Sequence, residues 1–328
     1  MKRRIILSRV PFRLPLGGGS TDLPSYYAEH GGFIFAVAID LYMDILIKEP
    51  VVDDCIHMHY LQYEFESKVE HIKHTIGREA LKMTKVSDKV LISLNADTPS
   101  GTGLGSSGAC SVGLLKGLSL FKGKEMSNLQ AAEDSFRLTQ NLGLPDGKQD
   151  PYVCALGGFV VLRIDKDGTV RVEKPEIPPD VVSSFEKNTL LFYTGIRRDS
   201  EPLLTKQNTP ETKELKHKIK EIGLDIYRSF LDGDLDSFGR LLDTHWRLKR
   251  GMSATMSNDG LNQMYDTAKK AGALGGKIIG AGGGGYFMFY CPTSASADSV
   301  RKALAPSALK EISFSVDRKG ARTHIIDF

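Results

Sequence analysis

Short apolar or alternating runs fill the first half of the chain, and they predict strands. Alternation is typical of a strand with one buried face, and β-branched runs are typical of buried strands. We therefore expect strands over residues 3–10, 33–48, 55–62, 63–70 and 89–94, and a hairpin over 157–164 and 169–174. Apolar positions at helical spacing predict helices over 72–84, 106–121 and 128–143.

The second half has a different pattern, in which amphipathic helices dominate. We expect a buried strand over 188–195, followed by helices near 211–231, 234–249 and 259–271. A strand–glycine turn–strand segment is expected over 275–291. The chain should close with a helix and then two strands, over 311–317 and 322–328. Strands and helices do not alternate regularly, so the predicted fold class is α+β. The 328 residues are enough for two domains, and the proline cluster at 175–180 places their boundary between 1–180 and 181–328.

Composition excludes several classes of protein. The net charge is only +3 and the charges are interleaved, which argues against a nucleic-acid binder. The four cysteines contain no CxxC pair, which favours buried thiols in a reducing compartment over disulfides or a zinc site. Arg9 and Arg13 interrupt the apolar region that a signal peptide needs, and no apolar run reaches the roughly 20 residues of a membrane span. We therefore expect a cytoplasmic protein that contacts no membrane.

Glycine is concentrated in three stretches, GGGSTD at 17–22, GTGLGSSG at 101–108 and GAGGGG at 280–285. The middle one lies between a predicted strand and a predicted helix, where inward-facing backbone amides and the helix N-terminus favour a phosphate. A surface linker is the alternative, but linkers seldom run into an apolar helix. The stretch lacks the GxxxxGK[ST] pattern. Its GxGxxG match starts about eight residues after the strand, which disfavours a dinucleotide-binding fold.

The middle stretch, PSGTGLGSSGA, resembles the ATP-binding motif of the GHMP kinases. VPFRLPLGGGSTDLP at 10–24 is similar to the family's N-terminal substrate motif, and KIIGAGGGGYF at 277–287 is similar to its C-terminal glycine loop. The resemblance implies an N-terminal domain like domain 2 of ribosomal protein S5, a ferredoxin-like C-terminal domain, and an active site between them. It also implies ATP and Mg²⁺ as cofactors.

Further stretches resemble the sugar-1-kinase branch of the family, and in particular the D-glycero-D-manno-heptose 7-phosphate 1-kinases. They are GKQDPYVCALGGF at 147–159, FYTGIRRDS at 192–200, HWRLKRGMS at 245–253 and the GGGSTD motif. The implied reaction transfers the γ-phosphate of ATP to the anomeric hydroxyl of a sugar phosphate. The alternatives are a kinase of free galactose or fucose, a mevalonate-type kinase, and a non-catalytic sensor of ATP or sugar. The expected partners are the sugar phosphate and ATP, and a homodimer is compatible with this sequence.

The resemblance assigns Asp150 as the catalytic base and Arg13 as its partner, although Asp150 could instead be a turn residue before Pro151. The residues that it assigns to ATP are Pro99, Gly101, Gly103, Leu104, Gly105, Ser106, Ser107 and Gly108. The residues expected to bind the substrate are Gly18, Gly19, Ser20, Thr21, Asp22, Lys148, Gln149, Arg197, Arg198, Gly282 and Gly283. Lys148 could instead be a solvated loop lysine, and Arg197 and Arg198 could be two solvated loop arginines. Asp22 could alternatively cap a helix.

Arg197 and Arg198 carry the expectation of a phosphorylated substrate, because two planar guanidinium groups suit phosphate oxygens. The metal site departs from the family, since Leu138 and Thr139 occupy the positions of its usual glutamate. We assign Ser107 and Glu133 as candidate ligands, because Mg²⁺ needs few protein ligands.

Four other residues have structural explanations. His57 and His59 alternate on a strand, which favours a solvated face over a metal site. We expect His245 and Trp246 to pack the C-terminal domain.

Overall fold

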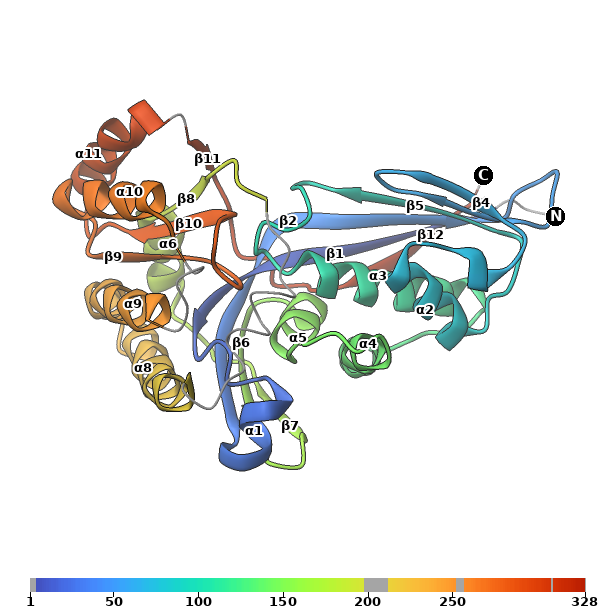
Figure 1. Ribbon diagram of the computed structural model, residues 1–328, viewed down its shortest axis with the longest axis horizontal. Helices are drawn as coiled ribbons and strands as arrows, with labels where there is room; N and C mark the ends of the chain where they lie inside the picture. The colour runs from blue at the N-terminus through green and yellow to red at the C-terminus, as the bar shows by residue number, and fades with distance from the viewer. Residues whose placement is uncertain (1–3, 198–211, 252–256, 308, 328) are drawn as a thin grey trace.

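Two sheets organise the chain in the computed structural model, which describes residues 4–197, 212–251, 257–307 and 309–327 (Figure 1). The larger sheet has the order β12-β1-β2-β5-β3-β4, and β6 and β7 branch from β2. Its strands are β1 Arg4–Gly17, β2 Gly32–Lys48, β3 Ile56–His59, β4 Tyr63–Glu66, β5 Val90–Ala96, β6 Phe159–Ile164, β7 Val170–Glu173 and β12 Arg322–Asp327. The smaller sheet has the order β11-β8-β10-β9, with β8 Thr189–Tyr193, β9 Gly275–Ile278, β10 Tyr286–Tyr290 and β11 Lys310–Ile312.

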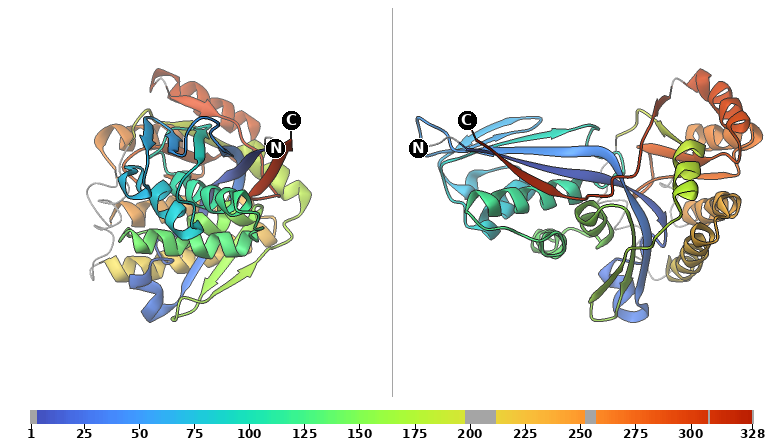
Figure 2. Two further views of the ribbon diagram at one scale, coloured as in Figure 1. Left: turned by 90° about the vertical axis from the view of Figure 1, so that its right-hand side faces the viewer. Right: turned by 180° about the vertical axis from the view of Figure 1, so that it is seen from behind.

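The helices pack against the two sheets. Those of the first half are α1 Pro24–His30, α2 Thr75–Thr84, α3 Ser106–Phe121, α4 Asn128–Asn141, α5 Gln149–Leu156 and α6 Pro179–Asn188. Those of the second half are α8 Lys213–Leu231, α9 Leu235–Arg250, α10 Asp259–Lys270 and α11 Ser294–Leu304. Two views show α2 to α5 below the larger sheet, with both termini at the end of the molecule far from the smaller sheet (Figures 1 and 2). The mixture of helices and sheets confirms the predicted α+β class.

Helix α3 lies close against the larger sheet because glycines face it. A Cβ on Gly113 would lie 2.8 Å from the Ile45 Cδ1, and one on Gly117 would lie 2.7 Å from the Ile47 Cδ1. Any larger residue would therefore push the helix away from β2. This contact fixes the N-terminus of α3, and with it the end of the glycine stretch at 101–108.

Three helices of the structure were not predicted from the sequence. Helix α5 holds Asp150 in its first turn, where the sequence predicts a loop, because Pro151 is tolerated there and Gly157 ends the helix with φ 71°. Helix α1 is only 7 residues long and begins with a proline, so its periodicity is weak. Helix α6 begins at Pro179, inside the proline cluster that predicts a domain boundary.

The end of the chain returns to the larger sheet, where β12 pairs antiparallel with the first part of β1. The strand predicted over 311–317 is short, because the backbone beyond it bonds to β2 instead: Asp40 N–H donates to Ser315 O, and Asp317 N–H to Ala38 O. Helix α8 also packs on β1 and β2. Elements from beyond residue 180 thus complete the larger sheet, while the division at that residue stays a prediction.

Two apolar clusters stabilise the molecule. The larger cluster contains residues of strands β1, β2, β5 and β6 and of helices α3, α4 and α5, packed together with residues of α8 and α9. Phe35, Phe159 and Phe230 belong to it. The smaller one lies between the smaller sheet and helices α9, α10 and α11, around Trp246 and Phe287. Within the described ranges, no helix combines the length and apolar character that crossing a bilayer requires.

Candidate active site

The glycine stretch at 101–108 adopts a conformation that side chains would prevent. Gly101, Gly103 and Gly105 have φ values of 77°, 91° and 82°, in the left-handed region that favours glycine. The stretch ends at the N-terminus of α3, where unpaired N–H groups and the helix dipole favour an anion. The hydroxyl of Ser107 has no hydrogen-bond partner among the described residues. This geometry supports the predicted phosphate loop.

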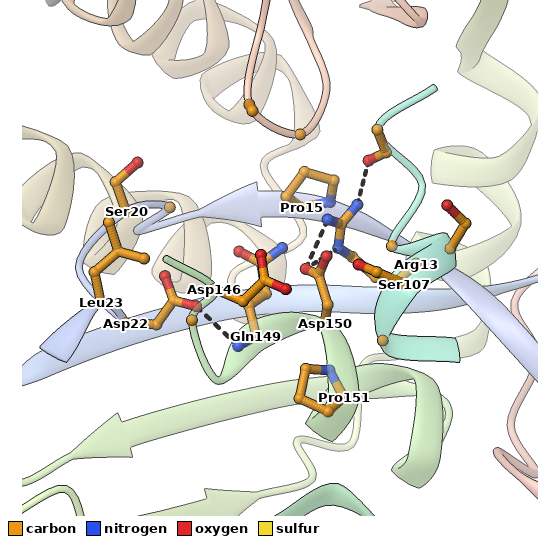
Figure 3. A pocket seen from close by; sticks show the side chains of 18 of the residues that line it. Arg13, Pro15, Ser20, Asp22, Leu23, Ser107, Asp146, Gln149, Asp150 and Pro151 are labelled. Carbon is orange, nitrogen blue, oxygen red and sulfur yellow. Dashed lines mark hydrogen bonds and ion pairs between the residues drawn. The ribbon is translucent and has the colours of Figure 1, made fainter. Parts of the chain in front are cut away.

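Arg13, which is buried, and Asp150, which is partly exposed, form an ion pair beside this loop (Figure 3). The Arg13 Nε and Nη2 donate to the Asp150 Oδ1 at 2.8 and 2.6 Å, and Nη1 donates to the carbonyl of Gly103. Both contacts use the same carboxylate oxygen, so within the described residues the Oδ2 has no hydrogen-bond partner. A Cβ on Gly108 would lie 2.7 Å from the Asp150 Cβ, so glycine is required where α3 meets α5. The pair therefore presents one basic oxygen next to the phosphate loop.

Asp22 lies on the other side of Gln149 from Asp150 (Figure 3). The backbone N–H of Gln149, the first residue of α5, donates to the Asp22 Oδ2 at 2.8 Å, whereas Asp22 does not cap α1, the helix that follows it in the sequence. Burial raises the pKa of Asp22, and the charge of nearby Asp150 raises it further. The hydrogen bond from the Gln149 N–H opposes this shift. A Cβ on Gly147 would lie 2.1 Å from the Asp22 Oδ2, so this loop requires glycine as well.

The segment before Asp22 divides into structural and accessible residues. Thr21 is fully buried, and its hydroxyl lies 2.7 and 2.8 Å from the carbonyl oxygens of Gly18 and Phe33. Thr21 therefore holds the turn and does not line the pocket. Gly19 and Ser20 do line it, and Ser20 has φ 72°, an uncommon value for a residue with a side chain.

The C-terminal glycine loop docks directly on the phosphate loop. Tyr286 N–H donates to Thr102 O at 3.2 Å, and a Cβ on Gly285 would lie 2.1 Å from that same oxygen. Gly280 and Ala281 of this loop line the pocket, whereas the predicted Gly282 and Gly283 do not. The smaller sheet thus closes the site over the larger one.

Two predicted site residues pair with each other outside the pocket. The Lys148 Nζ donates to both carboxylate oxygens of Glu133 at 3.1 Å, and lies 4.2 Å from the centre of the Phe136 ring. Tyr152 also donates to Glu133. Lys148 is 2% exposed, so this pairing satisfies a buried cation.

The structure fits a Mg²⁺ that arrives with a nucleotide better than a resident metal. No group of three or more histidines, cysteines or acids in the described ranges could hold an ion on its own. The residues that line the pocket do include Ser107, Ser135 and Thr139, which carry hydroxyls. Oxygen donors of this kind suit Mg²⁺, which usually keeps several waters.

A second groove adjoins the phosphate loop, and it shares Gly101, Ser106 and Ser107 with the pocket. Its lining includes Pro99 and the apolar side chains of Met43, Leu61, Ile76 and Leu94. Arg197 lines this groove, where its Nε donates to Ser100 O at 3.2 Å and its Nη2 lies 3.1 Å from the Ser100 Oγ. Arg197 does not line the pocket around Asp150, so a second phosphate bound in that pocket would need other cations. Arg198 lies outside the described residues. Leu104, also assigned to ATP, is buried, and its carbonyl accepts from Arg13 N–H.

Sequence reasoning missed a group of pocket residues. We expected His245 to pack a core, but it lines the pocket together with Lys249 and Lys277, while Trp246 does pack the smaller cluster. The spacing of His245 and Lys249 put both on one helix face, which was an available signal. The other unpredicted lining residues are Pro15, Leu23, Ser135, Thr139, Asp146, Gly147, Pro151, Ile278, Gly280 and Ala281.

The histidine pair on β3 is accounted for without a metal. The His57 Nε2 lies 2.9 Å from the Asp53 Oδ1, and its Nδ1 lies 3.1 Å from the Tyr63 hydroxyl. The His59 ring packs against Tyr63. Both rings are therefore surface contacts of the β3–β4 hairpin.

Comparison with known proteins agrees with this geometry. The family profile "GHMP kinases N terminal domain" matches residues 68–158, and "GHMP kinases C terminal" matches residues 226–311. The D-glycero-alpha-D-manno-heptose 7-phosphate kinase of Campylobacter jejuni is 27% identical over 98% of this chain and 99% of that protein. The L-fucokinase/L-fucose-1-P guanylyltransferase of Bacteroides fragilis is 24% identical over 93% of this chain, but over only 36% of that protein. A crystal structure of a D-glycero-D-manno-heptose 1-phosphate kinase from Bacteroides thetaiotaomicron superposes with a TM-score of 0.80 at 24% identity, covering 97% of this chain and 98% of that one.

Proposed function

Because the chain belongs to the GHMP kinases and is therefore an ATP-dependent kinase, we propose that it phosphorylates the anomeric hydroxyl of a sugar phosphate, with D-glycero-D-manno-heptose 7-phosphate as the substrate. The observation that carries the proposal is the Arg13–Asp150 pair, which lies between the phosphate loop and Asp22. The likeness to the C. jejuni heptose 7-phosphate kinase over nearly the whole chain supports the choice of sugar.

In this proposal the Asp150 Oδ2 accepts the proton of the attacking hydroxyl as the oxygen–phosphorus bond forms. Arg13 holds the carboxylate in place and adds positive charge where phosphate charge develops. Asp22 accepts hydrogen bonds from sugar hydroxyls, and the amides of residues 101–108 hold the phosphates of ATP. The bond between the γ-phosphorus and the oxygen that bridges it to the β-phosphate breaks, so the products are ADP and the sugar 1,7-bisphosphate.

Mg²⁺ bound with ATP would neutralise part of the phosphate charge, and Ser107 is the residue of this chain that we propose holds it. Glu133 was the second candidate, but its pairing with Lys148 and Tyr152 occupies its carboxylate. We therefore propose Ser107 alone.

The test is ADP release with a panel of acceptors: heptose 7-phosphate, the unphosphorylated heptose, galactose, fucose and mevalonate. We expect the fastest turnover with heptose 7-phosphate, and phosphorus NMR of the product should show a new anomeric phosphate. Turnover with none of these acceptors, together with tight ATP binding, would favour the sensor.

A free-sugar kinase is the second candidate, because the B. fragilis fucokinase matches 93% of this chain and Arg197 lies away from the sugar pocket. Equal kcat/KM for the heptose and its 7-phosphate would favour this candidate.

A further inference from the structure

The part of the pocket wall that comes from the second half of the chain is basic. His245 and Lys249 stand one turn apart on α9, and Lys277 comes from the neighbouring strand β9. All three line the pocket that contains Asp150 and Asp22. Their exposed fractions are 2%, 7% and 3%, so these are buried polar groups and not solvated surface charges.

Lys277 is a buried lysine with no carboxylate partner among the described residues. Its Nζ donates to Leu16 O at 2.9 Å, and no carboxylate of the described residues lies within ion-pair distance of it. Burial lowers the pKa of Lys277 strongly, and the positive charges of Lys249 and Arg13 lower it further. Lys249 in turn donates to the carbonyl of Gly280. The side chains of Lys277, Lys249 and Arg13 therefore lie around the same part of the pocket, where Arg13 is paired with Asp150.

His245 provides a second, independent sign of a missing ligand. Neither ring nitrogen has a hydrogen-bond partner in the described part of the chain, although the side chain is almost completely buried. Buried polar atoms are nearly always hydrogen-bonded in native proteins, and each exception calls for an explanation. A neutral imidazole can donate one N–H to an oxygen atom in the pocket. Burial and the two lysines lower the pKa of His245 and so favour that neutral form.

The position of this group points to the sugar rather than to ATP. Leu16, which accepts the hydrogen bond from Lys277, immediately precedes the 17–22 stretch that leads to Asp22. ATP already has a phosphate site in the amides of residues 101–108. A sugar monophosphate carries a charge of about −1.5 to −2 with three acceptor oxygens, which suits one imidazole N–H and two lysine amino groups, because a bound anion favours their protonated form.

We propose that His245, Lys249 and Lys277 form a phosphate subsite that binds the phosphate which the sugar substrate already carries. This inference rests on the proposed function in taking the second substrate to be a sugar, and it replaces the arginine pair at 197–198 that the sequence suggested. The subsite selects phosphorylated over unphosphorylated sugars, while the anomeric hydroxyl faces Asp150.

The kinetic test compares the heptose with its 7-phosphate in the wild type and in Lys277→Met. We expect the wild type to prefer the phosphorylated sugar by at least about tenfold in kcat/KM, the loss expected when one charged hydrogen bond is removed. In Lys277→Met this preference should fall to less than about threefold through a higher KM for the sugar phosphate, while the KM for ATP changes by less than about twofold.

A matched control is available in Lys116, another buried lysine whose Nζ donates to a backbone carbonyl, that of Met126. It lies on α3 and does not line the pocket. Lys116→Met should therefore keep the wild-type preference. Lys277→Met should also fold, because methionine of similar length replaces an unpaired buried charge. Lys249→Met is the second variant, and we expect the same loss of preference.

A binding test separates the subsite from the identity of the sugar. With the nucleotide site saturated by AMP-PNP, inorganic phosphate should raise the Tm of the wild type and of Lys116→Met, but not that of Lys277→Met. If phosphate does so and the wild type nevertheless uses both heptoses equally, the subsite stands and heptose 7-phosphate is the wrong substrate.

Two results would overturn the subsite. In the first, wild type and Lys277→Met respond equally to phosphate, or neither responds. In the second, the preference for heptose 7-phosphate survives in both Lys277→Met and Lys249→Met, and then the proposed function stands without the subsite. A rise in the KM for ATP with equal losses on both sugars would assign the three residues to the transferred phosphate instead.

Discussion

At the scale of single residues, Asp150 has two oxygens with different surroundings. Oδ1 accepts both hydrogen bonds from Arg13, and Oδ2 has no hydrogen-bond partner among the described residues. Asp150→Asn keeps the size of the side chain and removes its basicity. We expect kcat to fall by about 10²–10⁴, the usual contribution of a positioned general base. Nucleotide affinity, measured by calorimetry, should stay within about threefold, since the loop amides are untouched. A fall in kcat of less than tenfold would mean that Asp150 is not the base.

Asp22 links activity to stability through its ionisation. Burial raises the pKa of this carboxyl in the folded protein above its usual value of 3.8, so the folded state favours the protonated form. The stabilising contribution is fully present below the unfolded pKa and is lost as the pH rises through the folded pKa. Asp22→Asn has no charge to bury and can still accept from Gln149 N–H.

We therefore expect Asp22→Asn to raise the Tm of the ligand-free protein at pH 7, and to do so by less at pH 4.5. The same variant should increase the KM for the sugar by at least about tenfold, because one charged hydrogen-bond acceptor is lost. Thermal unfolding of both proteins across this pH range is the measurement. A Tm difference that does not change with pH would show that Asp22 is not a buried ionisable group.

At the scale of elements, the proposed phosphate binding by residues 101–108 depends on the backbone conformation of their glycines. Gly105 has φ 82°, and a Cβ there would lie 3.1 Å from the Arg13 Cγ. We expect Gly105→Val to abolish nucleotide binding in a fluorescence titration, while Ser107→Ala raises the Mg²⁺ concentration needed for half-maximal activity. Gly123→Val is the control for backbone strain, because Gly123 has φ 73° but a Cβ on it would meet no described atom within 4 Å. Wild-type nucleotide affinity in Gly105→Val would rule out this loop as the phosphate site.

The elements that sequence reasoning predicted are those with long, regular patterns. Helix α3 spans the predicted residues 106–121, because small and apolar residues fill its buried turns. Helix α5 was missed because eight residues beginning Gln-Asp-Pro give little periodicity, and its helical form depends on packing between α3 and β1. The same limit applied to the site. Motifs of contiguous residues led to the expectations for Asp150 and the glycine loop, which remain predictions. Lys277 and His245 are far apart in the sequence and come together only when the smaller sheet has formed.

At the scale of the whole molecule, one aromatic cluster spans both sides of the predicted boundary at residue 180. The ring of Phe230 on α8 lies 5.2 Å from that of Phe35 and 5.5 Å from that of Phe159, measured between ring centres. Phe185 of α6 lies 5.3 Å from the same ring. Aromatic pairs at such distances contribute beyond their buried area. The larger apolar cluster, to which these rings belong, also contains Leu191 of β8 and Tyr290 of β10, so the two sheets share a core and should unfold together.

The single tryptophan makes this expectation measurable. Trp246 is fully buried in the smaller cluster, so its fluorescence reports on the second half, whereas far-UV circular dichroism reports on every helix and strand. We expect urea unfolding curves from the two probes to coincide, as in a two-state transition. Phe230→Ala should lower the midpoints of both curves together, with a loss of about 3–5 kcal/mol in the free energy of unfolding. If the dichroism curve moved while the Trp246 curve kept its midpoint, the smaller sheet would be an independent folding unit, because its own cluster does not contain Phe230.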